Sequence, residues 1–234
     1  SIYGYVRLAD EIVDSFHDYN KTKLLKELRY ATTDALDNKI SLNPIINSFQ
    51  NTVKKYNIEW ELIDSFLKSM EYDIDHKNCD TNSYKKYIAG SAEAVGLMCL
   101  RVFVNGNNQE YLKLKPYAIS LGAAFQKINF LRDLKEDHEI LNRQYFPDFK
   151  IKNFDNEQKK LIEKEIELDF KKSLDGIKML KKDARKGVYL AYLYYTSLFK
   201  KIKKLDSSQI LEKRIRISNS KKILLLISLI LGIK

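Results

Sequence analysis

The sequence predicts an all-α fold in a single domain that spans residues 1–234. Apolar residues recur at three- and four-residue spacing along most of the chain, and no segment shows sustained alternation of apolar and polar residues. Only 3 prolines and 8 glycines interrupt the 234 residues, and the frequent Leu, Ile, Lys and Glu residues favour helices. With 44% hydrophobic residues, the chain is long enough to bury a complete core.

The N-terminal segment, residues 1–20, predicts a helix with an acidic stripe. On a helix, Tyr3, Arg7, Asp10 and Asp14 fall within about 60° of one another. A solvated face would explain such a stripe, and so would a ligand site. Both interpretations stay open at this point.

Two helices follow an irregular amphipathic stretch. Asn43 provides a cap and Pro44 a first-turn residue for one of them. The other begins near Trp60 and ends near Asp73. We interpret Asp73 as a helix-end acid, with a supporting position behind a binding site as the alternative.

The segment from Tyr84 to Val104 predicts one helix that is rich in small residues. Gly90 and Gly96 each cost about 0.5–1 kcal/mol relative to alanine inside a helix, so both need a reason. Close packing against another helix is one candidate reason, and room for a ligand is the other.

The most specific signal lies in a central helix, which a Gly- and Asn-rich loop and Pro116 are expected to precede. Gln126, Asn129, Asp133 and Asp137 fall within roughly 80° on one face of that helix. Two acids four residues apart cost about 0.2–0.5 kcal/mol through repulsion. A solvated face and a binding face are again both open.

Two long helices and a terminal apolar run complete the chain. The first, from about residue 156 to 182, should bury a stripe that includes Leu161 and Phe170, and the second covers residues 187–206. The run from Ile223 to Ile233 is too short to span a bilayer. It is expected to dock as a terminal helix, with a membrane-surface segment as the alternative because lysines flank it.

The chain is basic, with a formal net charge of +10. Such a charge favours nucleic acid, an anionic membrane surface or an anionic small molecule as the partner. The lysines are spread over several predicted helices, and no nucleic-acid-binding module is recognisable. We therefore expect no nucleic-acid partner and favour a phosphate-bearing lipid. Nothing in the composition indicates the oligomeric state.

Two cysteines, Cys79 and Cys99, lie in no CxxC or His-paired metal spacing, which indicates reduced thiols. We expect no signal peptide and no transmembrane helix, because no apolar run reaches the ~20 residues that span a bilayer. These features predict a cytoplasmic protein, with peripheral contact to the inner face of the membrane as an alternative.

Together, the two acidic stripes resemble the aspartate-rich motifs of the squalene/phytoene synthase family. The central helix matches Q-x-x-N-x-x-R-D-x-x-x-D, with Arg132 inside the motif, and R-x-Y-x-P follows it from Arg143. The N-terminal stripe matches Y-x-x-x-R-x-x-D-D/E-x-x-D, with Glu11 where aspartate is more usual. A looser match, Y-x-x-x-x-A-G-x-x-x-x-x-G, begins at Tyr84.

This resemblance implies a helical isoprenoid synthase bundle with a central apolar cavity and a prenyltransferase activity. The reaction would join two prenyl diphosphates head to head. The second motif and the RIRIS tail favour a phytoene-type condensation of two geranylgeranyl diphosphates through prephytoene diphosphate, the first step of carotenoid synthesis. A squalene- or dehydrosqualene-type synthase that uses farnesyl diphosphate is one alternative, and a prenyl-lipid-binding relative without turnover is another. The sequence does not choose between C15 and C20 substrates.

The resemblance also implies site residues. Two helices that each present a carboxylate pair suit Mg²⁺, which binds oxygen ligands and shares them with substrate phosphates. The implied metal ligands, with Mn²⁺ as an alternative ion, are Asp10, Asp14, Asp133 and Asp137, which act in catalysis with Tyr84. The implied substrate-binding residues are Tyr3, Arg7, Gln126, Asn129, Arg132, Arg143 and Tyr195.

Two absences from the family pattern shape the remaining expectations. No Gly-rich strand-turn-helix fingerprint occurs, so we expect no NADPH requirement. The family's usual N-terminal helix is not found ahead of Tyr3. We therefore expect either a trimmed chain or a shortened relative, less active than a chain that carries this helix.

Overall fold

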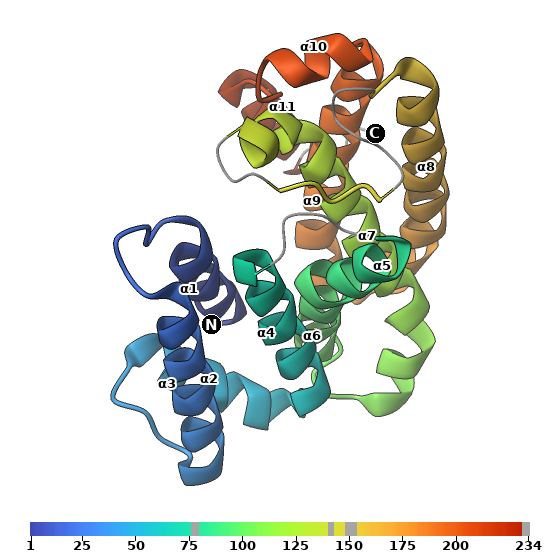
Figure 1. Cartoon of the computed structure of the whole chain (residues 1–234). Coiled ribbons are helices and arrows are strands. Elements are labelled where there is room, and N and C mark those ends of the chain that lie inside the picture. Colours follow the sequence, from blue (N-terminus) through green and yellow to red (C-terminus); the bar gives the residue numbers. More distant parts are fainter. Residues whose placement is uncertain (76–79, 140–142, 148–153, 231–234) are drawn as a thin grey trace.

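The computed structural model describes residues 1–75, 80–139, 143–147 and 154–230 (Figure 1). These residues form helices without a β-strand, which confirms the predicted all-α class. No helix among them is long and apolar enough to cross a membrane. The helices are α1 (Ile2–Asp14), α2 (Lys21–Asn38), α3 (Pro44–Tyr56), α4 (Trp60–Asp75), α5 (Thr81–Ile88), the π-helix η1 (Ala89–Ala94), α6 (Val95–Phe103), α7 (Asn108–Glu139), α8 (Asn156–Met179), α9 (Lys182–Lys203), α10 (Ser207–Glu212) and α11 (Asn219–Ile230).

Helix α7 forms the centre of the arrangement (Figure 1). It is 32 residues long and contacts α5, η1, α6, α8, α9 and α10. Helices α1 to α4 pack together on one side of the molecule. On the other side α8, α9 and α10 cover α7, and α11 packs against α9.

Helix α1 shows how the apolar spacing positions an acidic face. Tyr5 and Ala9 are fully buried on its inner side, and the ring of Tyr5 stacks on Phe49 of α3 with 3.9 Å between the ring centroids. Because successive residues on a helix are about 100° apart, burial of this side turns Asp10 and Asp14 away from the N-terminal core. The packing of α1 therefore decides where its two acids point.

Two predicted helix starts have different outcomes. Asn43 caps α3 as predicted, since its side chain accepts hydrogen bonds from backbone N–H groups of the first turn. Pro116, however, lies inside α7, which already begins at Asn108. A proline in that position removes the hydrogen bond to the carbonyl of Leu112. Leu112 is 58% exposed, so water reaches that turn of the helix.

Helix α8 buries a different stripe at its N-terminal end from the one predicted. Leu161 was predicted to be buried but is 56% exposed, and Ile162 is buried in its place. Ile166 and Phe170 continue the inward face as four-residue steps from Ile162. The inward direction of the helix is therefore set by this series, which leaves Leu161 about 100° away from it.

One α-helix was predicted from Tyr84 to Val104, and this prediction is wrong in its centre. The structure has α5, the π-helix η1 and α6 in succession there. A π-helical turn such as η1 is wider than an α-helical turn. Gly90 lies where η1 meets α4, and a Cβ atom there would collide with the carbonyl oxygen of Ser65. Gly96 instead lines a cavity. Close helix packing therefore explains Gly90, and room beside a cavity explains Gly96.

Replacing Gly90 by alanine should destabilise the protein by about 1–3 kcal/mol, because the new Cβ would overlap the backbone of α4 and lie 2.8 Å from Cβ of Ser69. Thermal unfolding followed by circular dichroism measures the change. Gly187→Ala on α9 is a matched control, since no atom lies within 4 Å of the Cβ that it would gain. That variant should gain about 0.4–1 kcal/mol. Equal stability of the two variants would contradict the close contact between η1 and α4.

Candidate active site

The acids of α1 reach the segment that follows α7. Asp10 is half-buried, and burial together with the nearby carboxylate of Asp14 raises its pKa to about 6. Asp14 is more exposed, and its Oδ1 accepts a hydrogen bond from Nη1 of Arg143 at 2.9 Å. The first acidic stripe is therefore tied to the R-x-Y-x-P segment, 129 residues away in the sequence.

A buried network around Asp73 supports the same segment. Asp73, in the last turn of α4, accepts hydrogen bonds from the hydroxyl groups of Tyr87 at 2.7 Å and Tyr145 at 2.9 Å. Nε of Arg143 donates to the backbone carbonyl oxygen of Asp73 at 3.2 Å and lies 4.0 Å from its Oδ1. Burial raises the pKa of Asp73 to about 6, although Arg143 and the two hydroxyl groups oppose the rise. Asp73 thus joins three parts of the chain, which goes beyond the role of a helix-end acid.

Asp137 approaches these acids from the last turns of α7. Burial raises its pKa to about 7; the carboxylates of Asp133, Asp73 and Asp14 act in the same direction, and Arg143 opposes them. The backbone N–H of Arg143 donates to the carbonyl oxygen of Asp137 at 2.7 Å, while the side chain of Arg143 reaches Asp14 and Asp73, so the acidic end of α7 lies next to α1 and α4. Arg143 interacts with all three of these carboxylates.

Asp133 has a different environment, because two arginines hold it. Arg132 donates from Nε to Oδ1 at 2.9 Å and from Nη2 to Oδ2 at 2.6 Å. Nε of Arg214 lies 2.9 Å from Oδ1 of Asp133, and its Nη1 lies 2.8 Å from Glu136. The sequence prediction did not include Arg214. The sequence signal that could have indicated Arg214 is the alternation of basic and apolar residues in RIRIS, residues 214–218. This segment, which we call the RIRIS strap, crosses α7, and the N–H of Ile215 donates to the carbonyl oxygen of Arg132 at 3.5 Å.

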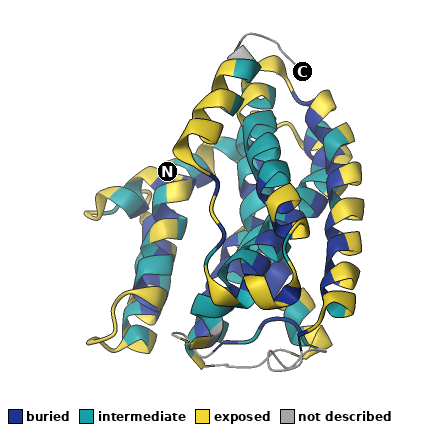
Figure 2. Ribbon diagram, turned by 90° about the horizontal axis from the view of Figure 1, so that it is seen from above, coloured by how far each residue is buried: buried dark blue, intermediate teal, exposed yellow. Residues whose placement is uncertain are grey.

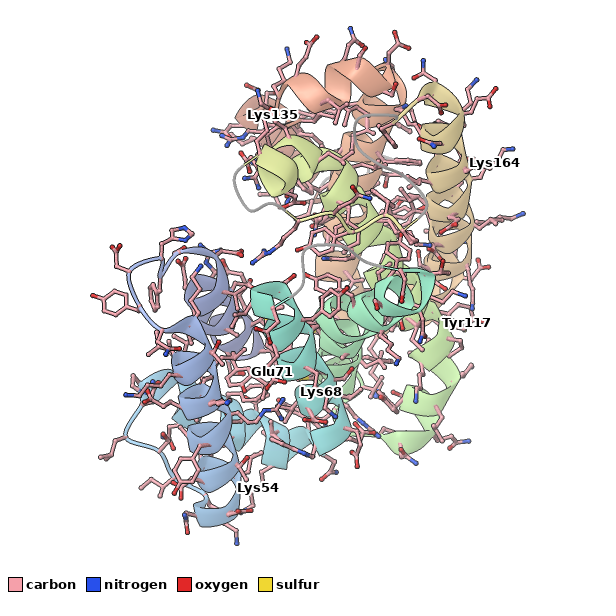
Figure 3. All side chains as sticks on the ribbon, viewed as in Figure 1. Lys54, Lys68, Glu71, Tyr117, Lys135 and Lys164 are labelled. Carbon is pink, nitrogen blue, oxygen red and sulfur yellow. The ribbon has the colours of Figure 1, made fainter. Side chains whose placement is uncertain are left out.

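An apolar cavity of about 420 Å³ lies beside the middle of α7, with further walls from η1, α6, α8 and α9. Its volume falls within the roughly 300–1,000 Å³ typical of small-molecule sites. Gly176 of α8 and Tyr117 of α7, which is labelled in Figure 3, approach closely in its wall. Cys99 also lines the cavity; it is unpaired, and burial raises the pKa of its thiol to about 11. Cys79 lies outside the described residues.

The polar lining of the cavity contains three predicted site residues, Gln126, Asn129 and Tyr195. The hydroxyl of Tyr195 donates to Oδ1 of Asn129 at 3.1 Å, and its ring stacks on Phe125 at 3.9 Å between centroids. Asn129 precedes Asp133 on α7 by about one turn, or roughly 6 Å. The polar end of the cavity therefore leads along α7 toward the acids.

Three other predicted site residues lie apart from this group. Tyr3 is 81% exposed, and Arg7 pairs with Glu11 one turn later, on the same face of α1 as Asp10. Tyr84 packs against the rings of Phe130 and Phe146, with centroids 6.1 and 5.8 Å away. Tyr84 is not one of the described residues that line the cavity.

A family model described as squalene/phytoene synthase matches residues 1–221. The chain belongs to the squalene/phytoene synthase family. This confirms the resemblance drawn from the two acidic motifs.

Two relatives in the family are distant from this chain in sequence. The phytoene synthase of Mycobacterium tuberculosis is 23% identical over 153 residues, which cover 63% of this chain and 47% of that protein. The 4,4'-diapophytoene synthase of Staphylococcus haemolyticus is 21% identical over 243 aligned positions, covering 95% and 82% of the two chains. The match to the mycobacterial family member thus spans about half of its length.

Solved structures confirm the fold of the family in this chain. A crystal structure of a dehydrosqualene synthase in complex with ligand superposes with a TM-score of 0.80 at 19% identity, covering 99% of this chain and 84% of that one. A squalene synthase from Alicyclobacillus acidocaldarius gives a TM-score of 0.75 at 16% identity, with coverage of 87% and 81%. The helical isoprenoid synthase bundle is therefore the architecture of this protein.

The donor chemistry of the two acidic faces fits a divalent cation of the kind that the family motifs imply. Carboxylate oxygens are the ligands that Mg²⁺ and Mn²⁺ accept. Burial and the neighbouring carboxylates raise the pKa values of Asp10 and Asp137, and a bound cation would offset both effects. Within the described ranges, no three His, Cys, Asp or Glu side chains are grouped closely enough to hold one ion. Arginines hold Asp14 and Asp133 in this conformation.

The raised pKa values predict that the metal-free protein loses stability as the pH rises. The pKa of an unperturbed Asp carboxyl is 3.8, and the folded protein raises it to about 6 for Asp10 and to about 7 for Asp137. Between these values the folded state binds more protons than the unfolded state, so the free energy of unfolding falls from about pH 4 to about pH 7. Thermal unfolding in EDTA, compared with the Asp137→Asn variant at each pH, isolates the contribution of Asp137. A constant difference between the two proteins from pH 4.5 to pH 8 would contradict this prediction.

Proposed function

We propose that this protein catalyses the Mg²⁺-dependent head-to-head condensation of two prenyl diphosphates. One observation carries the proposal: the acids of α1 and the acidic end of α7 are coupled through Arg143, and α7 leads from them to a largely apolar cavity. A substrate with a diphosphate head and a hydrocarbon tail fits this arrangement, with the head at the charged groups and the tail in the apolar cavity. The family membership supports the same reaction class.

The carboxylates and arginines would divide the work on the diphosphate groups. Asp10, Asp14, Asp133 and Asp137 would hold Mg²⁺, or Mn²⁺ in its place. Bound metal stabilises the negative charge that develops on the departing diphosphate. When phosphate oxygens arrive, Arg143 and Arg132 can exchange their present carboxylate partners for them, because a guanidinium binds both groups with paired hydrogen bonds.

The cavity would hold the hydrocarbon tails and keep water from the reacting carbons. Its lining is mostly apolar, and the polar groups are gathered at Gln126, Asn129 and Tyr195. These three side chains lie where a tail would meet its diphosphate head. Exclusion of water matters because departure of diphosphate from an allylic carbon leaves a cation that water would capture.

Within this reaction class we favour two geranylgeranyl diphosphates as substrates, with phytoene as the product. The second acidic motif and the RIRIS strap support that choice. Condensation of farnesyl diphosphate to a squalene- or dehydrosqualene-type product is the alternative. Similarity to both a phytoene synthase and a diapophytoene synthase leaves the two equally consistent with the family. For a phytoene- or dehydrosqualene-type product we propose that no NADPH is required; squalene itself would need a reductant such as NADPH, and its NADPH-dependent formation would count against the phytoene-type assignment.

The test supplies farnesyl or geranylgeranyl diphosphate with Mg²⁺ and without NADPH, and measures released diphosphate and extracted hydrocarbon. We expect diphosphate release that EDTA abolishes, and a C40 hydrocarbon from the C20 substrate. A C30 product from farnesyl diphosphate alone would replace the phytoene assignment by the alternative. Tight binding of both substrates without diphosphate release would overturn the enzymatic proposal in favour of a prenyl-lipid-binding protein.

A further inference from the structure

Helix α11 presents an apolar face to solvent. Ile223 and Leu224 are 57% and 56% exposed, and Leu226 and Ile227 are 43% and 46% exposed. The four side chains fall on one side of the helix, because the largest angle between any two of them is about 160°. In Figure 2 the ribbon of α11 is coloured mostly as exposed, in contrast to α9 beside it. Exposed apolar side chains gathered in this way are typical of a surface that binds another protein or a membrane.

Basic residues flank this face along the chain, and the same segment of sequence contains no acidic residue. From Lys213 to Lys234 the sequence contains six Lys and Arg residues and no Asp or Glu. Lys221 and Lys222 lie in the first turn of α11, on either side of the apolar face, and both are exposed. Lys222 also stands over the ring of Tyr194, 5.7 Å from its centroid. Lysines in such positions can extend their ammonium groups toward anions while their stems stay against an apolar layer.

The position of α11 connects this face with the cavity. Lys201 near the end of α9 donates to the carbonyl oxygen of Arg216 at 2.7 Å, and Lys222 lies over Tyr194. The two helices therefore run antiparallel, so the later turns of α11 point toward the N-terminal half of α9. That half contains Gly187 and Val188, which line the cavity. Gly187 is exposed, and no atom lies within 4 Å of the position that its Cβ would take.

We propose that α11 and its basic border form a docking surface for an anionic lipid bilayer, with the helix lying in the plane of the membrane surface. An apolar stripe bordered by lysines is the combination that binds the headgroup region of such a bilayer. A second copy of the chain fits less well, because a symmetric contact through this face would bring the two basic borders together. The docking follows from α11 alone. Its use, to bring the cavity next to the lipid that receives an apolar product, rests on the proposed function.

Flotation with vesicles tests the proposal on the full chain. One vesicle preparation contains phosphatidylcholine alone, and the other contains equal parts of phosphatidylcholine and phosphatidylglycerol. We expect at least about tenfold tighter binding to the anionic vesicles, from about 1 kcal/mol for each lysine near the surface. This preference should shrink in 1 M salt, where the screening length falls to about 3 Å.

Paired substitutions assign the binding to α11. Ile223→Ser/Ile227→Ser and Lys221→Glu/Lys222→Glu should each weaken binding to anionic vesicles by about tenfold or more. Leu161→Ser/Leu168→Ser removes two similarly exposed apolar side chains from α8, at 56% and 68% exposure, and should change nothing. Lys26→Glu/Lys54→Glu is the charge control and makes the same charge change on α2 and α3, which pack with each other and with α1 and not with α11. Lys54 is labelled in Figure 3. All four variants alter exposed residues, so circular dichroism should show unchanged folding.

Three results would overturn the proposal. They are no binding to the anionic vesicles, binding that both α11 variants retain, and a dimer in sedimentation experiments that Ile223→Ser/Ile227→Ser dissociates in the absence of vesicle binding. The last result would assign the face to a second copy of the chain. Turnover of detergent-dispersed substrate should be the same in the α11 variants and the parent protein. Failure of the proposed reaction and failure of docking are thus separate outcomes.

Discussion

Asp137→Asn should lower turnover by about 10²–10³-fold and leave the metal-free protein as stable as before or more stable. The loss of turnover is the size expected when one group that stabilises the charge of the transition state is removed. The gain in stability follows from the environment of Asp137, whose pKa is raised to about 7 by burial and by the neighbouring carboxylates. Neutral asparagine removes that repulsion. Turnover and thermal unfolding in EDTA measure the two effects.

The matched control is Glu139→Gln, which removes the same charge from an exposed side chain two residues further along α7. It should change turnover less than about twofold and stability by no more than about 0.5 kcal/mol. Added Mg²⁺ with inorganic diphosphate should stabilise the parent and the control but stabilise Asp137→Asn much less. Full activity of Asp137→Asn would remove Asp137 from the proposed reaction.

Asp133→Asn should lower the stability of the metal-free protein, whereas Asp137→Asn should not. The two acids differ in this respect although they lie on the same face of α7. Asp133 is held by Arg132 and Arg214. Its neutral replacement weakens those ion pairs and should lower stability in EDTA by about 1–2 kcal/mol, while turnover falls as it does for Asp137→Asn. A rise in the melting temperature of Asp133→Asn would contradict the ion pairs that the structure assigns to it.

Asp73→Ala should destabilise the protein by about 2–4 kcal/mol. The substitution leaves the buried hydroxyl groups of Tyr87 and Tyr145 without their acceptor and removes a carboxylate next to Arg143. For a chain of this length the melting temperature should fall by roughly 10 °C. Turnover in folded protein should also fall by about 10–100-fold, because Arg143 loses the buried carboxylate that lies 4.0 Å from its Nε.

Two substitutions separate the role of this network from a general effect on α4. Asp75→Ala removes an exposed acid from the same turn of the helix and should be close to neutral. Asp73→Asn keeps the shape and one acceptor oxygen, so it should recover about half of the lost stability. If Asp75→Ala and Asp73→Ala lower the melting temperature equally, Asp73 is no more than a helix-end acid.

The sequence by itself determined the fold class, the family and the identity of the acidic residues. These properties depend on local spacing, which the chain carries regardless of its partners. Asn43 and Pro44 start α3 because capping involves only neighbouring backbone groups. Gln126, Asn129, Asp133 and Asp137 share one face of α7 because the pitch of a helix is fixed.

The tertiary structure alone decided which of these residues interact. Asp14 and Arg143 are 129 residues apart, and no periodicity predicts their ion pair. The two arginines on Asp133 come from α7 itself and from the distant RIRIS strap, so the different environments of Asp133 and Asp137 could not be predicted from their spacing.

Packing also decided burial where several helical faces were plausible. Leu161 and Ile162 are equally apolar, and only the direction of α8 against α7 chose Ile162 for the core. Asp73 looked like a helix-end acid until α5 and the segment after α7 brought two tyrosine hydroxyl groups to it. Spacing along a helix fixes which side chains share a face, whereas the charge and burial of each side chain depend on what the rest of the chain packs against that face.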